Sequence, residues 1–219
     1  MRKKYEEQLE LMHQKLIDMG KLCEDAIMVA ANALLNGDDE ARVFANKLEQ
    51  EIDAAERDVE HLCVRLLLHQ QPMATDLRRV TAAQMMIIDM ERIGDQAADI
   101  SEISQYMKGS AVKSDGYIDD MARATAKMVT ESIDSFVNKD LNLAREVVQY
   151  DDVIDDLFRK IKLELIERLQ KDSQLAQECL DLLMIAKYFE RIGDHATNIA
   201  QWVLYYLTGS RETHNDPEI

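Results

Sequence analysis

The chain has 219 residues, of which 47% are hydrophobic, so it is long enough to form two small domains or one medium domain with a proper core. Its formal net charge of −16 disfavours a general nucleic-acid binder, because contact with phosphates requires a basic surface. The 3 cysteines show no redox or zinc-finger spacing, the first residues lack the apolar stretch of a signal peptide, and no apolar run approaches a membrane span, so we expect a soluble cytoplasmic protein.

Only 7 glycines and 2 prolines interrupt a sequence rich in leucine, alanine, methionine, glutamate and lysine, which favours long helices over strands. In chain order we predict a helix over about 5–35, a turn at Asn36-Gly37-Asp38, a helix that ends near His69, and a third helix over about 74–107 after Pro72. A linker at 108–116 precedes three further helices over about 117–137, 140–170 and 173–207. The polar tail at 208–219 is expected to be flexible.

A five-residue segment, Glu-Arg-Ile-Gly-Asp, occurs at 91–95 and again at 190–194. The turn at Asn36 and the Ile-Asp pair at 52–53 also have second copies, at Asn138 and at 154–155, each 102 residues further along the chain. Self-similarity at a nearly fixed spacing indicates a duplicated unit. We therefore predict an all-α fold of six long helices, arranged as two tandem three-helix bundles related by pseudo-two-fold symmetry. The first bundle comprises 1–107 and the second 117–207.

Each copy of the segment carries two carboxylates four residues apart, which places them on one face of a helix. The preceding helix of each unit carries a second acidic pair with the same spacing. Folding each pair of helices about its turn, with a rise of about 1.5 Å per residue, brings the two acidic pairs to one level of the bundle. The carboxylates are Glu49, Asp53, Glu91 and Asp95 in the first unit and Asp151, Asp155, Glu190 and Asp194 in the second. Asp99 extends the first set by one helical turn, whereas the second unit has Asn198 there, which keeps an oxygen but loses the charge.

Like charges at this spacing cost about 0.2–0.5 kcal/mol in an exposed helix, and four acids that face each other cost more unless a proton or a cation neutralises them. Clustered carboxylates suit Mg²⁺, Mn²⁺, Ca²⁺ or iron, so we predict a metal site in each unit. Two alternatives stay open: a metalloenzyme that uses the same carboxylates, and a metal-free helical scaffold with solvated acids. A ferritin-type di-iron oxidase is disfavoured, because only Glu10 and His13 match its ExxH motif and they have no second copy.

Both Glu-Arg-Ile-Gly-Asp segments, the pair Asp151-x-x-x-Asp155 and the stretch Pro72-Met-Ala-Thr-Asp-Leu-Arg78 resemble the PhoU family of phosphate-transport accessory and regulatory proteins. The resemblance covers both units and implies two pseudo-symmetric three-helix bundles. It also implies metal ions at the bundle surface, often as iron clusters, with magnesium, manganese, zinc or calcium as alternatives. The ligands implied are Glu49, Asp53, Glu91, Asp95 and Asp99 in the first unit and Asp151, Asp155, Glu190, Asp194 and Asn198 in the second.

The function that this resemblance implies is regulatory and not enzymatic. Members of the family restrain the phosphate-starvation response when phosphate is plentiful, as adaptors between the ATPase subunit of a phosphate ABC transporter and a membrane sensor histidine kinase. A protein of this kind acts in the cytoplasm and reaches the inner face of the cell membrane through its protein partners. The resemblance further implies a homodimer.

Overall fold

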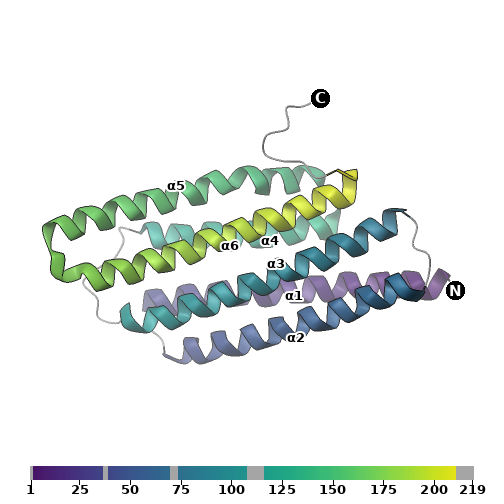
Figure 1. Cartoon of the computed structure of the whole chain (residues 1–219), viewed down its shortest axis with the longest axis horizontal. Helices are drawn as coiled ribbons and strands as arrows, with labels where there is room; N and C mark the ends of the chain where they lie inside the picture. The colour runs from purple at the N-terminus through teal and green to yellow at the C-terminus, as the bar shows by residue number, and fades with distance from the viewer. Residues whose placement is uncertain (1, 37–38, 70–73, 108–115, 211–219) are drawn as a thin grey trace.

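The computed structural model describes residues 2–36, 39–69, 74–107 and 116–210 (Figure 1). Over these ranges it contains six long helices, namely α1 (Arg2–Asn36), α2 (Asp39–His69), α3 (Ala74–Ser104), α4 (Tyr117–Asn138), α5 (Leu141–Lys171) and α6 (Ala176–Thr208). A 3-10 turn, η1 (Gln105–Met107), follows α3, and a second one, η2 (Ser173–Leu175), precedes α6. The predicted all-α fold with six long helices is confirmed.

Several predicted connections lie outside the described residues. They are the centre of the turn at 36–38, the turn at 70–73 with Pro72, most of the linker at 108–116, and the tail beyond 210. In the second unit the corresponding connections are described, and aspartates cap the helices there. The Asp140 carboxylate accepts hydrogen bonds at 3.0 Å from the backbone N–H groups of Asn142 and Leu143, which satisfies two donors at the start of α5. Asp172 follows α5 and accepts a hydrogen bond from the Gln174 backbone N–H at 2.9 Å.

Four helices form one layer of the molecule, in the order α5, α6, α3 and α2, and α1 and α4 pack behind this layer (Figure 1). The central helices α3 and α6 carry the two Glu-Arg-Ile-Gly-Asp segments and contact each other. Helix α2 packs beside α3, and α5 packs beside α6. Each acidic segment therefore has the matching acidic pair on the adjacent helix of the same layer.

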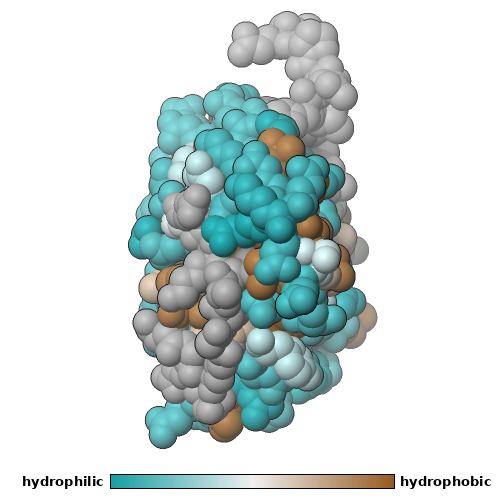
Figure 2. Space-filling view, turned by 90° about the vertical axis from the view of Figure 1, so that its left-hand side faces the viewer, coloured by the Kyte–Doolittle hydropathy of each residue, from teal (hydrophilic) through white to brown (hydrophobic). Residues whose placement is uncertain are grey.

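Apolar residues at helical spacing line the interior of both units and join into one hydrophobic core. Flexible methionines contribute to it, among them Met86 and Met90, which are fully buried. The three cysteines, Cys23, Cys63 and Cys179, are buried free thiols, as predicted. The end of the molecule where α5 leads into α6 is largely hydrophilic, with hydrophobic residues scattered among polar ones (Figure 2). Within the ranges that the structure describes, no helix combines the length and apolar composition needed to cross a membrane.

Candidate metal centres

The first acidic cluster comprises Glu49 and Asp53 on α2 and Glu91 and Asp95 on α3, and it lies where these two helices pack together. Glu49, Asp53 and Asp95 are partly buried, and each offers one carboxylate oxygen. These three oxygens lie within 4.8 Å of one another. One cation could contact all three, with water completing its coordination, because hard cations prefer oxygen ligands of this kind.

Gly94 determines how closely α2 approaches α3 at this cluster. A Cβ atom at Gly94 would lie 2.8 Å from Cδ1 of Ile52, which is closer than carbon atoms pack. Ile52 is fully buried and directly precedes Asp53, just as Gly94 directly precedes Asp95. A helical glycine costs about 1 kcal/mol relative to alanine. The close approach of the two helices is the physical reason for glycine at this position.

The charges of the first cluster disfavour full ionisation. Partial burial raises the pKa of Glu49, and the neighbouring charges of Asp53 and Asp95 raise it further. The pKa of Glu91 is also raised, first by burial and then by Asp95, although Arg92 opposes this shift. The Arg92 guanidinium lies 3.3 Å from a Glu91 oxygen and 3.3 Å from an Asp95 oxygen. The Arg57 guanidinium lies 3.7 Å from an Asp53 oxygen. Two exposed arginines therefore face four carboxylates, and a cation would relieve the remaining negative charge.

An open depression with a volume of about 390 Å³ adjoins the first cluster between α2 and α3. Glu49, Asp95 and Asp99 line it, together with Gln96. Only 5% of Gln96 is exposed, and its Oε1 atom has no hydrogen-bond partner among the residues that the structure describes. A buried amide oxygen without a partner costs free energy until water or a ligand satisfies it. Gln96 is therefore a further candidate oxygen donor at the first cluster, and sequence reasoning missed it.

The second acidic cluster comprises Asp151 and Asp155 on α5 and Glu190 and Asp194 on α6. Gly193 faces Ile154 here, as Gly94 faces Ile52 in the first unit. The second contact is looser, because a Cβ atom at Gly193 would lie 3.4 Å from Cγ2 of Ile154. In the described part of the chain, only the first cluster brings three ligand atoms within 4.8 Å of one another. The duplicated sequence therefore gives two clusters of unequal geometry.

The second cluster also carries excess negative charge. Burial of its carboxyl group raises the pKa of Asp194 to about 6, with further contributions from Glu190 and Asp151. The pKa of Asp151 is raised by burial and by Asp155. Asp194 is nevertheless an exposed residue, so solvent screens part of this repulsion. Lys187 opposes it as well, because its ammonium group forms an ion pair with Glu190. Each cluster thus includes basic side chains of its own, arginine in the first and lysine in the second.

Asp99 and Asn198, the predicted outer ligands of the two units, form hydrogen bonds between α3 and α6. The Asn198 amide donates to a carboxylate oxygen of Asp89 at 3.2 Å, and Nδ1 of His195 lies 2.9 Å from the same oxygen. Asp99 accepts a hydrogen bond from the Tyr188 hydroxyl. Asp89 and Tyr188 are 99 residues apart, as are Asp99 and Asn198, so the two contacts are pseudo-symmetric. In the first unit the Asp99 carboxylate accepts from the Tyr188 hydroxyl, and in the second the Asn198 amide donates to the Asp89 carboxylate. The difference between Asp99 and Asn198 therefore matches the difference between their partners.

A position-by-position comparison of the two units could have revealed this contact, because Asp89 and Tyr188 occupy equivalent positions, as do Gln96 and His195. The structure brings eight of the ten predicted ligands together as two clusters of four. It places the other two, Asp99 and Asn198, in hydrogen bonds at the boundary between the units, although Asp99 also lines the depression beside the first cluster. Whether these residues hold a metal stays a prediction.

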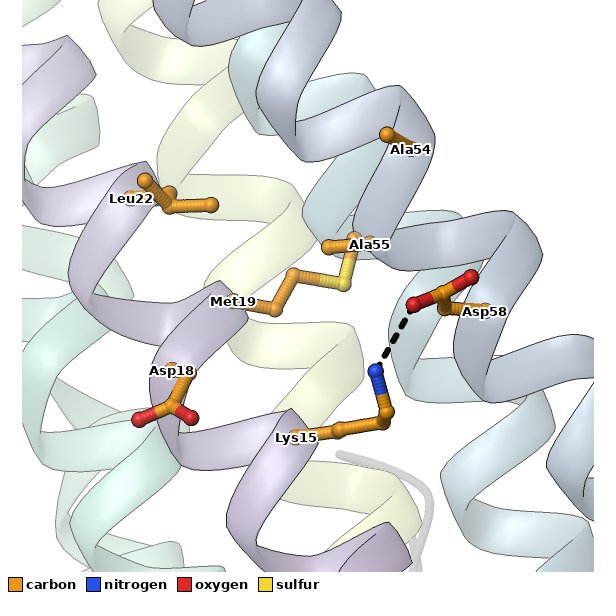
Figure 3. Close-up of a pocket in the computed structure, with 7 residues that line it drawn as sticks. All are labelled: Lys15, Asp18, Met19, Leu22, Ala54, Ala55 and Asp58. Carbon is orange, nitrogen blue, oxygen red and sulfur yellow. Dashed lines mark hydrogen bonds and ion pairs between the residues drawn. The ribbon is translucent and has the colours of Figure 1, made fainter.

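A separate groove lies between α1 and α2 and has a volume of about 280 Å³ (Figure 3). Met19 and Leu22 of α1 and Ala55 of α2 line it, and an ion pair between Lys15 and Asp58, at 2.7 Å, spans one end. The residue 102 positions after Ala55 is Leu157, which is buried in the second unit. A small side chain at 55 therefore explains the room in the first unit, and no cluster residue lines the groove.

The model of the PhoU domain matches the chain twice, over residues 16–104 and 118–203. The chain belongs to the PhoU family. It is 32% identical over 209 residues to the phosphate-specific transport system accessory protein PhoU homolog of Pseudomonas aeruginosa, which covers 94% of this chain and 86% of the relative. The PhoU homolog of Clostridium acetobutylicum is 32% identical over 220 residues, which covers 98% of this chain and 99% of the relative.

Solved PhoU structures have the same fold. The crystal structure of PhoU from Pseudomonas aeruginosa superimposes with a TM-score of 0.89 at 32% identity, over 94% of this chain and 100% of that chain. The phosphate transport system regulatory protein PhoU from Streptococcus pneumoniae superimposes with a TM-score of 0.88 at 24% identity, over 95% and 99%. The family resemblance inferred from the sequence motifs is therefore confirmed.

Proposed function

We propose that this PhoU-family protein is a non-enzymatic regulator of phosphate uptake and of phosphate-starvation signalling that binds metal ions at its acidic clusters. It restrains the starvation response at high phosphate, as a cytoplasmic adaptor between the ATPase subunit of a phosphate ABC transporter and a sensor histidine kinase. The names of its relatives, accessory proteins of a phosphate-specific transport system, support the transport part of this proposal. The convergence of Glu49, Asp53 and Asp95 within 4.8 Å supports the metal part.

The chemistry of the donor set fits a hard cation. The clusters offer carboxylate oxygens, and Gln96 adds an unpartnered amide oxygen at the first one. Burial and then neighbouring carboxylates raise the pKa of Glu49 and Glu91, and a bound cation would favour their ionised forms. Because Asp53 and Asp95 belong to adjacent helices, joint coordination would also tie α2 to α3. Metal occupancy would thus change both the charge and the rigidity of the helical layer that faces solvent.

Deletion of the gene in a host with an intact phosphate regulon tests the regulatory role, with a starvation-induced promoter as the reporter. We expect the reporter to be active at high phosphate and to be silenced again by the wild-type chain. A chain with Asp53→Asn and Asp95→Asn should silence it less well, while Asp18→Asn, which removes an exposed acid outside the clusters, serves as the matched control. Unchanged reporter output in the deletion strain at high phosphate would contradict the proposal.

The metal part needs its own measurement. After chelation and repletion, elemental analysis should find stoichiometric metal in the wild type and less in the variant with Glu91→Gln and Asp95→Asn. If the wild type retains no stoichiometric metal, the metal part is refuted, and the regulatory part is unaffected. We further propose that the chain, with a mass of 25.2 kDa, is a homodimer, which light scattering tests directly.

A further inference from the structure

We propose that the end of the molecule where α1 and α3 begin and α4 ends binds a phosphate group, either as inorganic phosphate or as part of a small phosphate ester. These elements lie together at the right of Figure 1, and α1 contacts both α3 and α4. The proposal does not depend on the metal binding proposed above, because no member of either acidic cluster takes part. The groups that would hold the phosphate are Tyr5 and His13 of α1, Arg79 of α3 and Lys139 at the end of α4.

Arg79 is a partly buried cation without a counter-ion. Within the described part of the chain its guanidinium forms no ion pair and no hydrogen bond, although Asp76 lies one turn earlier on α3 and the protein has 42 acidic residues. Arg78, the next residue, lies instead beside Gly209 at the end of α6. Removal of a guanidinium from water costs free energy unless an anion replaces the water. A phosphate group suits this cation, because it accepts two parallel hydrogen bonds from an arginine.

The hydroxyl group of Tyr5 is a buried donor near Arg79. Tyr5 is 8% exposed, and its hydroxyl has no hydrogen-bond partner among the described residues. Burial raises the pKa of Tyr5, Asp76 raises it further and Arg79 lowers it, so both charges lie close to the hydroxyl. A buried hydroxyl without a partner costs free energy until a ligand or water accepts its proton. An anion bound by Arg79 could do so.

His13 lies between Arg79 and Lys139. Its ring packs against Phe136 of α4, with the two ring centres 5.4 Å apart. Burial lowers the pKa of His13, and the charges of Arg79 and Lys139 lower it further, whereas Glu10 acts in the opposite direction. The Nδ1 atom of His13 is buried and has no hydrogen-bond partner in the ranges that the structure describes. A phosphate among these groups would reduce their mutual repulsion and give Nδ1–H an acceptor.

Lys139 has a backbone conformation that favours glycine. Its φ of 54° lies in the left-handed region, and among the described residues it is the only one other than glycine with a positive φ. The residue 102 positions earlier, at the same place in the repeat, is Gly37. The second unit thus keeps a strained lysine where the first unit has glycine. A role for its ammonium group beside His13 would account for this strain.

Two acids oppose an anion at this end of the molecule, since the charges of Glu10 and Asp76 reach His13 and Tyr5. An anion therefore gains little from the overall charge and has to form hydrogen bonds with several donors at once. A phosphate group offers several strong acceptor oxygens that point in different directions, so it can satisfy a guanidinium, an ammonium group and a hydroxyl together.

The test uses the full chain, stripped of metal with a chelator so that phosphate cannot bind through a metal ion. Calorimetry at constant ionic strength measures the affinity for inorganic phosphate and, separately, for AMP, and the ring resonances of His13 report where the ligand binds. We expect one ligand per chain and a shift of the His13 resonances. Arg79→Gln should weaken binding at least about tenfold, because a charge-assisted hydrogen bond is lost. Tyr5→Phe should weaken it about twofold to tenfold.

Lys139→Gly separates a ligand-binding role from a structural one. It removes the strain and the charge together, so the urea midpoint in phosphate-free buffer should rise while phosphate binding weakens about tenfold. The matched control is Arg159→Gln, which causes the same change in net charge at an exposed arginine paired with Asp156 and should leave the affinity unchanged. Phosphate should raise the urea midpoint of the wild type and not that of Arg79→Gln.

The absence of saturable binding of both phosphate and AMP would overturn the proposal. So would an unchanged affinity in Arg79→Gln and Lys139→Gly, or a fall of the phosphate-free urea midpoint in both variants, since the two cations would then be structural. Tighter binding of phosphate than of AMP would assign the site to the free ion, and the reverse order to an ester; each supports the proposal. None of these outcomes bears on the metal ions or on the regulatory role proposed above.

Discussion

Gly94 and Gly193 occupy the same position of the repeated segment, yet alanine should have opposite effects at the two sites. A Cβ atom at Gly94 would lie 2.8 Å from Cδ1 and 3.3 Å from Cγ2 of the buried Ile52. At Gly193 the nearest atom is Cγ2 of Ile154, at 3.4 Å, which is an ordinary van der Waals contact. An added methyl group would therefore overpack the site at Gly94, whereas the site at Gly193 has room for it.

Two opposing contributions to the free energy of unfolding set the size of each effect. Replacement of a helical glycine by alanine gains about 1 kcal/mol, because alanine loses less backbone entropy on folding. Forcing an extra methyl group into a packed core costs about 1–3 kcal/mol. Gly193→Ala should therefore raise the free energy of unfolding by about 0.5–1 kcal/mol. Gly94→Ala should lower it by up to about 2 kcal/mol.

Urea unfolding in the presence of a chelator measures both variants without a contribution from bound metal. Ile52→Val removes Cδ1, the atom that a Cβ at Gly94 would strike, so Gly94→Ala should cost less in that background than in the wild type. A shift of the same sign and size for Gly94→Ala and Gly193→Ala would refute the reasoning. So would a double variant whose loss equals the sum of the single losses.

The same substitution should affect the first cluster. The close approach at Gly94 brings α2, which carries Asp53, against α3, which carries Asp95. If alanine pushes these helices apart, the three carboxylate oxygens no longer lie within one coordination sphere. Gly94→Ala should therefore weaken Mn²⁺ binding to the first cluster, and Gly193→Ala, as the matched control, should leave it unchanged.

Three further changes have defined outcomes. The folded-state pKa of Asp194, about 6, lies above its ordinary value of 3.8, so its stabilising contribution is complete below about pH 4 and is lost as the pH rises through 6. In the chelated protein the urea midpoint of the wild type should fall relative to that of Asp194→Asn between pH 4 and 7, and parallel curves would contradict this. Ala55→Leu, which copies Leu157 of the second unit, should fill the groove between α1 and α2 and raise the free energy of unfolding by about 1 kcal/mol in urea unfolding, whereas a loss would mean that the groove is too small. Asn198→Asp should place a second carboxylate beside Asp89 and lower the thermal midpoint by the equivalent of about 1–3 kcal/mol, while an unchanged midpoint would mean that the Asn198–Asp89 hydrogen bond does not contribute to stability.

The acidic clusters were predictable in composition because their members share one helical period. Carboxylates four residues apart lie on one helix face, and a hairpin brings Asp53 level with Glu91 at a constant rise per residue. This reasoning gives the position along the helix axis only. The angle around the axis and the side-chain rotamers depend on packing, so the convergence of Glu49, Asp53 and Asp95 within 4.8 Å could not be read from spacing. The spacing of the acidic pairs did not reveal the partner of Asn198 either, because Asp89 lies 109 residues away and only a comparison of the two units relates it to Tyr188.

The six helices, their grouping into a repeated unit, the acidic pairs and the family could all be read from the amino-acid sequence. Helical periodicity, the rarity of glycine and proline, and a repeated segment are local properties of the chain. Which acids converge, where Lys187 lies and what Asn198 contacts became known from the packing of the helices alone. Those outcomes depend on how α2, α3, α5 and α6 pack against one another. The two copies pack differently, because a Cβ atom at Gly94 would lie 2.8 Å from Ile52 and one at Gly193 would lie 3.4 Å from Ile154.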